Sequence, residues 1–240
     1  MLELAKRSHW LQTLVVRLIA AVPPAVEHNI EKTRAIKKAF YFAYLEQIPG
    51  DYLEFGVYEG TSLIAAFESH RKFSLPELPR AFWGFDSFAG FKYFDERDQH
   101  PFFHEGEFAS SYEQTERRIA GHFKGRANWK LIKGYFEETL HNKCAPDFGI
   151  EKISVALIDC DLGTPALLAL NFMLPALQNG SILILDDYFA YGGSRAVGVA
   201  GAFRQFQREQ PHLAFRRLFD YGHGGQGFVL ADLLTDTPSI

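Results

Sequence analysis

The spacing of apolar residues changes near Gly50 and divides the chain into two parts. Before Gly50, apolar residues recur every three or four positions, as at Ile36, Ala39, Phe40 and Ala43, which predicts an amphipathic helix. After Gly50, short apolar runs alternate with helical patterns. We therefore expect an N-terminal helical extension over residues 1–48 and a single domain over residues 49–240.

Seven apolar runs in the second part have the length and composition of strands. They are Tyr52–Val57, Ala81–Phe85, Trp129–Lys133, Ser154–Ile158, Ser181–Leu185, Leu213–Phe219 and Gly227–Ala231. Helical patterns between the first six predict parallel strands with crossover connections. The last two runs are joined only by a short glycine-rich turn, so the final strand is expected to run antiparallel. The predicted fold is α/β: a Rossmann-like sheet of six parallel strands and an antiparallel last strand, with helices on both faces.

Composition narrows the class of protein. The formal net charge is −4 and 47% of the residues are hydrophobic, which excludes a disordered tail, a collagen-like fibre and a basic nucleic-acid binder. The apolar stretch from Leu11 to Val22 contains Arg17 and is too short to span a bilayer. It predicts a helix that packs, dimerises or lies on a membrane surface, and a homodimer is one expectation. Two cysteines form no disulfide framework, so we expect a cytoplasmic location.

Ligands of an open α/β sheet bind beyond the carboxyl ends of its strands, so the residues there are the first candidates. The first strand leads through Gly56 and Gly60 to Thr61 and Ser62 at a helix start, where free N–H groups face a ligand. The G-x-G-x-x-G fingerprint is absent, because Tyr58 and Gly60 break its spacing. This argues against NAD, and a plain strand–helix turn is the alternative.

The second and third strands end in candidate nucleoside contacts. Asp86 stands where acidic residues accept hydrogen bonds from ribose hydroxyls, although an aspartate in this position, taken alone, is more often a turn cap. Gly134, Tyr135 and Phe136 follow the third strand and are candidates for the wall of an adenine pocket. A helix start with acids near its dipole is the alternative there.

The fourth and fifth strands end in carboxylates. Asp159 and Asp161 follow the fourth strand, and Asp186 and Asp187 follow the fifth. Carboxylates on neighbouring strands would repel one another and raise each other's pKa unless a cation lay between them. Their oxygen atoms suit Mg²⁺, Mn²⁺ or Ca²⁺, whereas helix capping and loop solvation are the alternatives.

Two further features are predicted to lie at the same edge. His223, in the turn between the last two strands, is a candidate general base or hydroxyl-binding group. The segment from Ser87 to Ala109 is longer than an ordinary connection, which favours a lid or a substrate loop.

Four short motifs resemble one family of enzymes. In order they are Gly50–Gly60, Phe85–Phe88, Ile158–Leu162 and Asp186–Tyr188. Together they resemble the macrocin O-methyltransferase family of S-adenosylmethionine-dependent class I methyltransferases, over about residues 30 to 232. The chain departs from the family at Gly163, where a tyrosine is usual. The resemblance implies methylation of hydroxyls, often on deoxysugars of antibiotics, with Mg²⁺ (or Mn²⁺) holding the acceptor.

The resemblance also implies roles for individual residues. Glu54, Gly56 and Gly60 would surround the methionine part of the cofactor, and Asp86, Ser87 and Phe88 its nucleoside. Asp159, Asp186 and Asp187 would bind the metal, with Asp161 supporting them. The complete set of expected cofactor contacts is Glu54, Gly56, Gly60, Thr61, Ser62, Asp86, Ser87, Phe88, Gly134, Tyr135, Phe136 and Asp159.

The expected function is S-adenosylmethionine-dependent, metal-assisted O-methylation of a sugar or a sugar-bearing natural product. The candidates for the base that removes the hydroxyl proton are His223, His104 and a metal-site carboxylate such as Asp159. A phenol or catechol O-methyltransferase would share the carboxylates. An NAD-dependent oxidoreductase and a non-catalytic cofactor-binding protein are the remaining alternatives.

Overall fold

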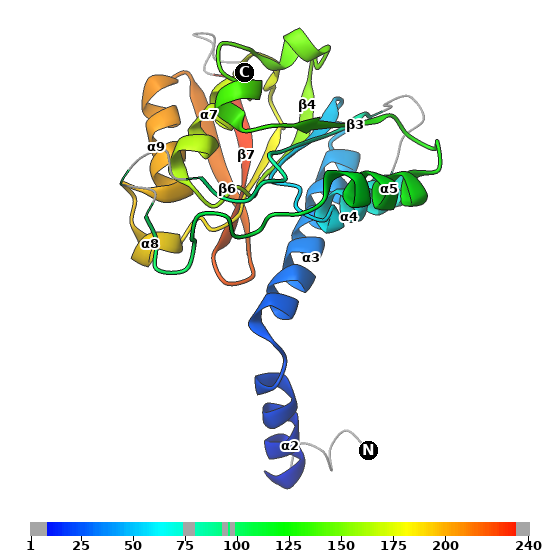
Figure 1. Cartoon of the computed structure of the whole chain (residues 1–240), viewed down its shortest axis with the longest axis vertical. Coiled ribbons are helices and arrows are strands. Elements are labelled where there is room, and N and C mark those ends of the chain that lie inside the picture. Colours follow the sequence, from blue (N-terminus) through cyan, green and yellow to red (C-terminus); the bar gives the residue numbers. More distant parts are fainter. Residues whose placement is uncertain (1–8, 74–79, 93–95, 97–98, 234–240) are drawn as a thin grey trace, which may run out of the picture.

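A seven-stranded sheet forms the centre of the computed structural model, which describes residues 9–73, 80–92, 96 and 99–233 (Figure 1). The strand order is β3-β2-β1-β4-β5-β7-β6. The strands are β1 Asp51–Phe55, β2 Phe82–Asp86, β3 Trp129–Lys133, β4 Ile153–Ile158, β5 Ile182–Leu185, β6 Leu213–Tyr221 and β7 Gly225–Leu233. Strand β7 is antiparallel to both of its neighbours, and the other six strands share one direction. The predicted fold is thereby confirmed.

Helices cover both faces of the sheet. The α-helices of the described residues are α2 His9–Ala20, α3 Pro24–Leu45, α4 Thr61–Phe73, α5 Tyr112–Phe123, α6 Phe136–Thr139, α7 Gly163–Met173, α8 Ala190–Gly193 and α9 Gly198–Glu209. Helices α3, α4 and α5 pack on one face, and α6, α7 and α9 on the other. The strands serve both cores because their side chains alternate: Val155 and Leu157 face α3, whereas Ala156 and Ile158 face α7.

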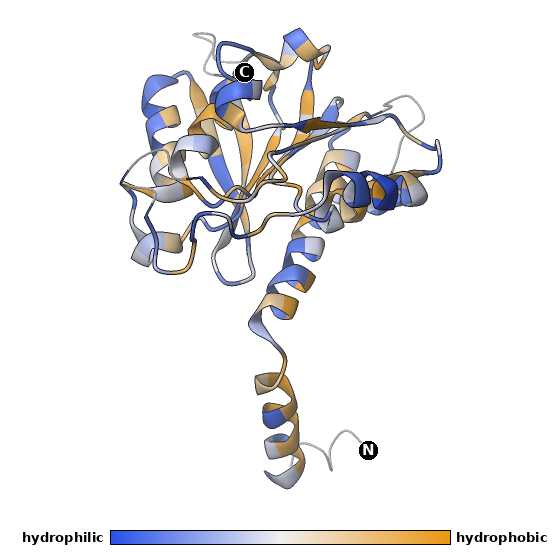
Figure 2. Cartoon of the chain, in the orientation of Figure 1, coloured by the Kyte–Doolittle hydropathy of each residue, from blue (hydrophilic) through white to orange (hydrophobic). Residues whose placement is uncertain are grey.

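The N-terminal part divides into a packed helix and an unpacked one. Helix α3 buries Ala35, Ile36, Ala39, Phe40 and Ala43 against the sheet, so it belongs to the core of the fold. Helix α2 buries none of its side chains and stands away from the body (Figure 1). It is mostly apolar (Figure 2). Among the described residues no single helix is long and apolar enough to cross a membrane, and α2 and α3 meet that test only as a pair bent by 85°. The division at residue 48 stays a prediction.

The strand order predicts a ligand-binding crevice beyond the carboxyl ends of β1 and β4. From these two adjacent strands the chain continues toward opposite edges of the sheet, which is where open α/β sheets bind ligands. Phe55, Ile158 and Leu185 lie in register at the ends of β1, β4 and β5. The residues that follow each of them therefore emerge side by side at one edge.

Candidate functional site

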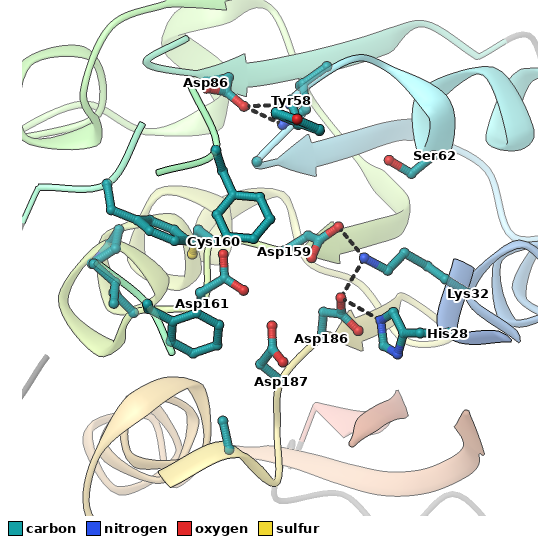
Figure 3. Close-up of a pocket in the computed structure, with 18 of the residues that line it drawn as sticks. His28, Lys32, Tyr58, Ser62, Asp86, Asp159, Cys160, Asp161, Asp186 and Asp187 are labelled. Carbon is teal, nitrogen blue, oxygen red and sulfur yellow. Dashed lines mark hydrogen bonds and ion pairs between the residues drawn. The ribbon is translucent and has the colours of Figure 1, made fainter. Parts of the chain in front are cut away.

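A cavity of about 660 Å³ lies at this carboxyl edge of the sheet. Its walls come from the ends of β1, β2, β4 and β5, from the first half of α3 and from the turn between β6 and β7 (Figure 3). The long segment between β2 and α5 contributes Phe91, Phe103 and Phe108 to the wall, although residues 93–95 and 97–98 of that segment lie outside the described residues. The structure thus brings the predicted strand ends and part of the predicted substrate loop to one hollow.

Asp86 organises the β1–β2 side of the cavity. Its carboxylate accepts backbone N–H bonds from Val57 and Tyr58, both at 2.7 Å, and from Phe88 at 2.6 Å (Figure 3). A carboxylate has roughly four lone-pair positions, so about one remains for a ligand hydroxyl. Asp86 therefore fixes the loop after β1 and still lines the cavity.

Glu54 lies beneath the cavity wall and is fully buried. It accepts hydrogen bonds from the hydroxyls of Tyr52 at 2.6 Å and Ser62 at 2.7 Å. Burial raises the pKa of Glu54 to about 7, although these two donors and the nearby charge of Lys32 oppose the rise. In this structure Glu54 positions Ser62, whose side chain lies on the cavity wall.

The predicted cofactor contacts divide into two groups in the structure. Those on the cavity wall are Gly56, Thr61, Ser62, Asp86, Ser87, Tyr135, Phe136 and Asp159. The others, Glu54, Gly60, Phe88 and Gly134, lie behind the wall; Phe88, for example, is buried with its ring against Tyr112. The role of either group toward a cofactor stays a prediction.

Three carboxylates converge on the β4–β5 side. One oxygen atom from each of Asp159, Asp161 and Asp187 lies within 4.8 Å of the others. Asp161 and Asp187 have φ angles of 61° and 48°, a left-handed backbone that is uncommon for residues other than glycine and is frequent at functional sites. Burial raises the pKa values of Asp159 and Asp161, and the neighbouring carboxylates raise them further. The hard oxygen atoms of these three carboxylates fit a divalent cation.

Asp186 occupies a different environment from the one that the sequence suggested. Its Oδ2 atom lies 2.5 Å from Lys32 Nζ and 3.1 Å from His28 Nε2 (Figure 3). Its Oδ1 atom accepts a 2.7 Å hydrogen bond from the Tyr221 hydroxyl. Burial alone would raise the pKa of Asp186, but the charge of Lys32 and the hydrogen bond from His28 hold it below its ordinary value. Lys32 Nζ also lies 2.7 Å from Asp159.

Sequence reasoning missed both Lys32 and His28, which approach the strand ends from α3. A signal was present, because His28, Lys32, Ile36 and Phe40 follow one another at four-residue steps. Ile36 and Phe40 are buried against the sheet, so the same helix face continues to Lys32 and His28.

The two histidines proposed as bases lie in different places. His223 lines the main cavity, with Nε2 3.0 Å from the Pro24 carbonyl oxygen and its ring stacked on His28. His104 is exposed and lines a separate, smaller hollow beside Phe108. The structure therefore brings His223, but not His104, to the wall that carries the carboxylates.

Comparison with known proteins identifies the family to which the chain is similar. The family model for macrocin-O-methyltransferase (TylF) matches residues 26–213. A Streptomyces olivaceus enzyme named 8-demethyl-8-(2,3-dimethoxy-alpha-L-rhamnosyl)-tetracenomycin-C 4'-O-methyltransferase is 26% identical over 184 residues, which cover 72% of this chain and 67% of that one. Mycinamicin III 3''-O-methyltransferase from Micromonospora griseorubida is 23% identical over 176 residues, covering 69% and 66%. The chain thus aligns with about two thirds of each relative's length.

A solved structure of similar fold is CalS11, titled a calicheamicin methyltransferase. It superimposes with a TM-score of 0.63 at 21% identity, covering 83% of this chain and 79% of that one. The family match spans most of the chain, which confirms the resemblance seen in the motifs and decides against an oxidoreductase or a non-catalytic binding protein. The chain belongs to the macrocin-O-methyltransferase family and is an O-methyltransferase.

Proposed function

We propose that the protein transfers the methyl group of S-adenosylmethionine to a hydroxyl of a sugar or sugar-bearing natural product, assisted by a divalent cation. One observation carries the proposal: a single cavity is lined both by the β1–β2 loops and by the converging carboxylates. The names of two similar proteins support a sugar acceptor. The Streptomyces enzyme is named for a rhamnosyl tetracenomycin, and CalS11 is also titled a TDP-rhamnose 3'-O-methyltransferase.

The residues on the β1–β2 side suit a nucleoside linked to an amino acid. S-Adenosylmethionine supplies a methyl group on a positively charged sulfonium. Tyr135 and Phe136 offer aromatic faces on the cavity wall, and Asp86 has acceptor capacity for a ribose hydroxyl. Ser62, held by Glu54, offers a hydroxyl toward the amino-acid part. Holding donor and acceptor together in this cavity removes much of the entropic barrier to reaction.

The residues of the β4–β5 side would hold the metal. Asp159, Asp161 and Asp187 supply hard oxygen ligands at one point of the wall. A divalent cation lowers the pKa of a hydroxyl that binds to it and fixes the orientation of that hydroxyl.

His223 is the base that this geometry favours. A carbonyl oxygen only accepts hydrogen bonds, so the contact with Pro24 places the ring hydrogen on Nε2 and leaves the lone pair of Nδ1 available. Asp159, the other candidate on the wall, is already paired with Lys32. The acceptor hydroxyl would pass its proton to His223 Nδ1 as its oxygen bonds to the methyl carbon. The bond between that carbon and the sulfonium sulfur would break at the same time, with the electron pair staying on sulfur and S-adenosylhomocysteine leaving.

Transfer assays with the full chain test the proposal. The protein is incubated with S-adenosylmethionine and either a rhamnoside with adjacent free hydroxyls, a nucleotide-linked rhamnose or a catechol, with EDTA or with Mg²⁺. We expect methylation of a sugar that EDTA abolishes and Mg²⁺ restores. Methylation of the catechol alone would contradict the sugar assignment, and sugar methylation in EDTA would contradict metal assistance.

A matched variant tests the base. His223→Gln keeps a side chain that can reach Pro24 but removes the basic nitrogen, so we expect kcat to fall by about 100-fold with little change in KM. An unchanged kcat would assign the proton transfer to another group.

A further inference from the structure

We infer that a second hollow beside the main cavity binds a flat, uncharged aromatic aglycone. The preferred acceptor is then a sugar already linked to such a group, and not a nucleotide-linked sugar. The inference rests on the proposed sugar acceptor and narrows its class. Its basis is a set of aromatic side chains that the two hollows share, on the side of the cavity formed by the long segment between β2 and α5.

The second hollow adjoins the main cavity. It has a volume of about 400 Å³, and its lining residues are Tyr58, Pro101, Phe102, His104, Glu107 and Phe108. Three of these residues, Tyr58, Phe102 and Phe108, also line the main cavity. A ligand whose sugar occupies the main cavity can therefore extend into the second hollow along one continuous wall.

The three shared side chains form an exposed aromatic surface. Tyr58, Phe102 and Phe108 are 43%, 65% and 49% exposed. Single apolar side chains are ordinary on a protein surface, but aromatic rings gathered at the mouth of a cavity are typical of a ligand-binding groove. A planar aromatic molecule gains most from such a surface, because ring stacking adds to the burial of apolar area.

The backbone holds Tyr58 in place before a ligand binds. Its N–H donates to Asp86 at 2.7 Å, and its carbonyl oxygen accepts hydrogen bonds from the hydroxyls of Ser110 and Thr115 at 2.7 and 3.0 Å (Figure 3). The ring of Phe108 packs edge-on against Tyr58, with 5.9 Å between the ring centroids. A surface that is already ordered loses little conformational entropy on binding, so more of the apolar contact is retained as affinity.

The segment that carries Phe108 is also fixed near its base. Phe91 donates its N–H to the carbonyl oxygen of Glu107 at 3.0 Å, and Gly106 donates to the carbonyl oxygen of Phe91 at 2.9 Å. This antiparallel pairing ties the residues just before Phe108 to the residues that follow β2. The position of the Phe108 ring is therefore set by the fold and does not require a ligand.

The charges of the second hollow favour an uncharged occupant. Within the described ranges no lysine or arginine lines it, and its ionisable side chains are those of His104 and Glu107. The Glu107 carboxylate accepts the backbone N–H of His104 at 3.1 Å. Diphosphates are recognised by cationic donors, above all arginine and lysine. A diphosphate in this hollow would meet a carboxylate instead.

The lysines of the main cavity do not supply the missing charge. Those on the described wall are Lys32 and Lys92. Lys32 Nζ lies 2.7 Å from Asp159, and Lys92 Nζ lies 5.4 Å from the centre of the Tyr135 ring, on the side proposed for the cofactor. An aglycone and a nucleotide diphosphate are attached to the same anomeric carbon of a sugar, so they compete for the same surface. The aromatic wall and the absence of cations both favour the aglycone.

Calorimetric titration of the full chain, saturated with S-adenosylhomocysteine and Mg²⁺, tests the inference with three rhamnosides. Methyl rhamnoside has no ring on its anomeric oxygen, naphthyl rhamnoside has a flat apolar one, and TDP-rhamnose has a nucleotide. We expect naphthyl rhamnoside to bind at least about tenfold more tightly than methyl rhamnoside, and TDP-rhamnose no more tightly than methyl rhamnoside. Equal binding of the naphthyl and methyl rhamnosides, or tightest binding of TDP-rhamnose, would overturn the inference and leave the sugar acceptor in place.

A pair of variants locates the aglycone. Phe102→Ala should reduce the preference for naphthyl over methyl rhamnoside to less than about threefold. Tyr41→Ala is the matched control, because Tyr41 is 48% exposed on α3 and lines neither hollow, so the preference should stay as in the wild type. A merely structural effect of Phe102→Ala would weaken both rhamnosides alike and keep their ratio, and that result would overturn the inference.

Naphthol without a sugar separates the inference from the proposed function. Its binding to the protein saturated with S-adenosylhomocysteine, followed by its fluorescence, should weaken at least about fivefold in Phe102→Ala. If naphthol binds in this way and no rhamnoside binds, the sugar acceptor is contradicted and the aromatic site is supported. If neither naphthol nor naphthyl rhamnoside binds to folded protein, the inference is overturned.

Discussion

Single residues at the end of β1 show how the sheet fixes the site. Glu54 is a carboxylic acid buried among hydroxyl donors, and Gly56, directly after β1, has a φ angle of 94°. A Cβ atom on Gly56 would overlap the carbonyl oxygen of Asp159. A small substitution at either residue should therefore change the free energy of unfolding measurably.

Glu54 should make the stability of the protein depend on pH. Its pKa is about 7 in the folded chain and near 4.5 when unfolded, so the folded state retains the proton over that interval. The free energy of unfolding of the wild type should therefore fall, relative to Glu54→Gln, by about 3 kcal/mol between pH 4.5 and pH 7. Urea unfolding of both proteins at about pH 5 and about pH 8 measures this change. A difference that does not vary with pH would show that Glu54 titrates normally.

Gly56 should tolerate no side chain. Gly56→Ala combines a left-handed backbone with a clash against Asp159, so we expect it to lower the free energy of unfolding by about 3 kcal/mol. Gly125→Ala is the matched control: its φ is 70°, but nothing lies within 4 Å of the added Cβ, so only about 1 kcal/mol should be lost. Equal losses in the two variants, measured by chemical denaturation, would contradict the proposed close contact.

At the scale of elements, the sequence predicted the strands well and the site only in part. Strand β3 has the predicted bounds, and the shared register of β1, β4 and β5 follows from their apolar runs. The pairing of Asp186 with Lys32 could not be predicted, because it depends on how α3 docks on the sheet. A lone lysine on a helix is ordinarily exposed. The four-residue spacing from Ile36 places Lys32 on the packed face of α3, but it does not say which side chain Lys32 reaches.

The hydrogen-bond partners of Asp161 and Asp186 could not be predicted for a similar reason. Both follow a strand, and their side-chain directions depend on the left-handed backbone at Asp161 and on donors from distant elements. The position of His104 could not be predicted either. It lies in a long loop, and its spacing in the sequence does not indicate which hollow of the surface it will line.

Helix α2 has an apolar stripe that the described part of the chain leaves exposed. Trp10, Leu14 and Leu18 lie along one face at four-residue steps, and all three are exposed. We expect a second copy of the chain to cover this stripe, as the sequence suggested. Light scattering during gel filtration should give a mass of twice 27.3 kDa for the wild type and 27.3 kDa for the double variant Leu14→Gln/Leu18→Gln.

Thr13→Gln, on another face of α2, is the control for this prediction and should remain dimeric. A monomeric wild type, or a double variant that stays dimeric, would contradict the role given to the helix.

At the scale of the whole molecule, function depends on the order of the strands. A crevice forms beyond the carboxyl ends of β1 and β4 because the chain continues from these two strands toward opposite edges of the sheet. The motif residues gather there from positions more than 100 residues apart in the sequence. That convergence could be predicted from the sequence. The contribution of α3 to the same cavity could be predicted only in part. The four-residue spacing places Lys32 and His28 on the packed face of the helix, but the docking of α3 on the sheet decides what they contact.

The central claim is that this cavity binds the methyl donor. Calorimetric titration of the full chain with S-adenosylhomocysteine, in buffer containing Mg²⁺, tests it most directly. The account predicts one binding site per chain with micromolar affinity or tighter. Absence of binding to protein that circular dichroism shows to be folded would contradict it.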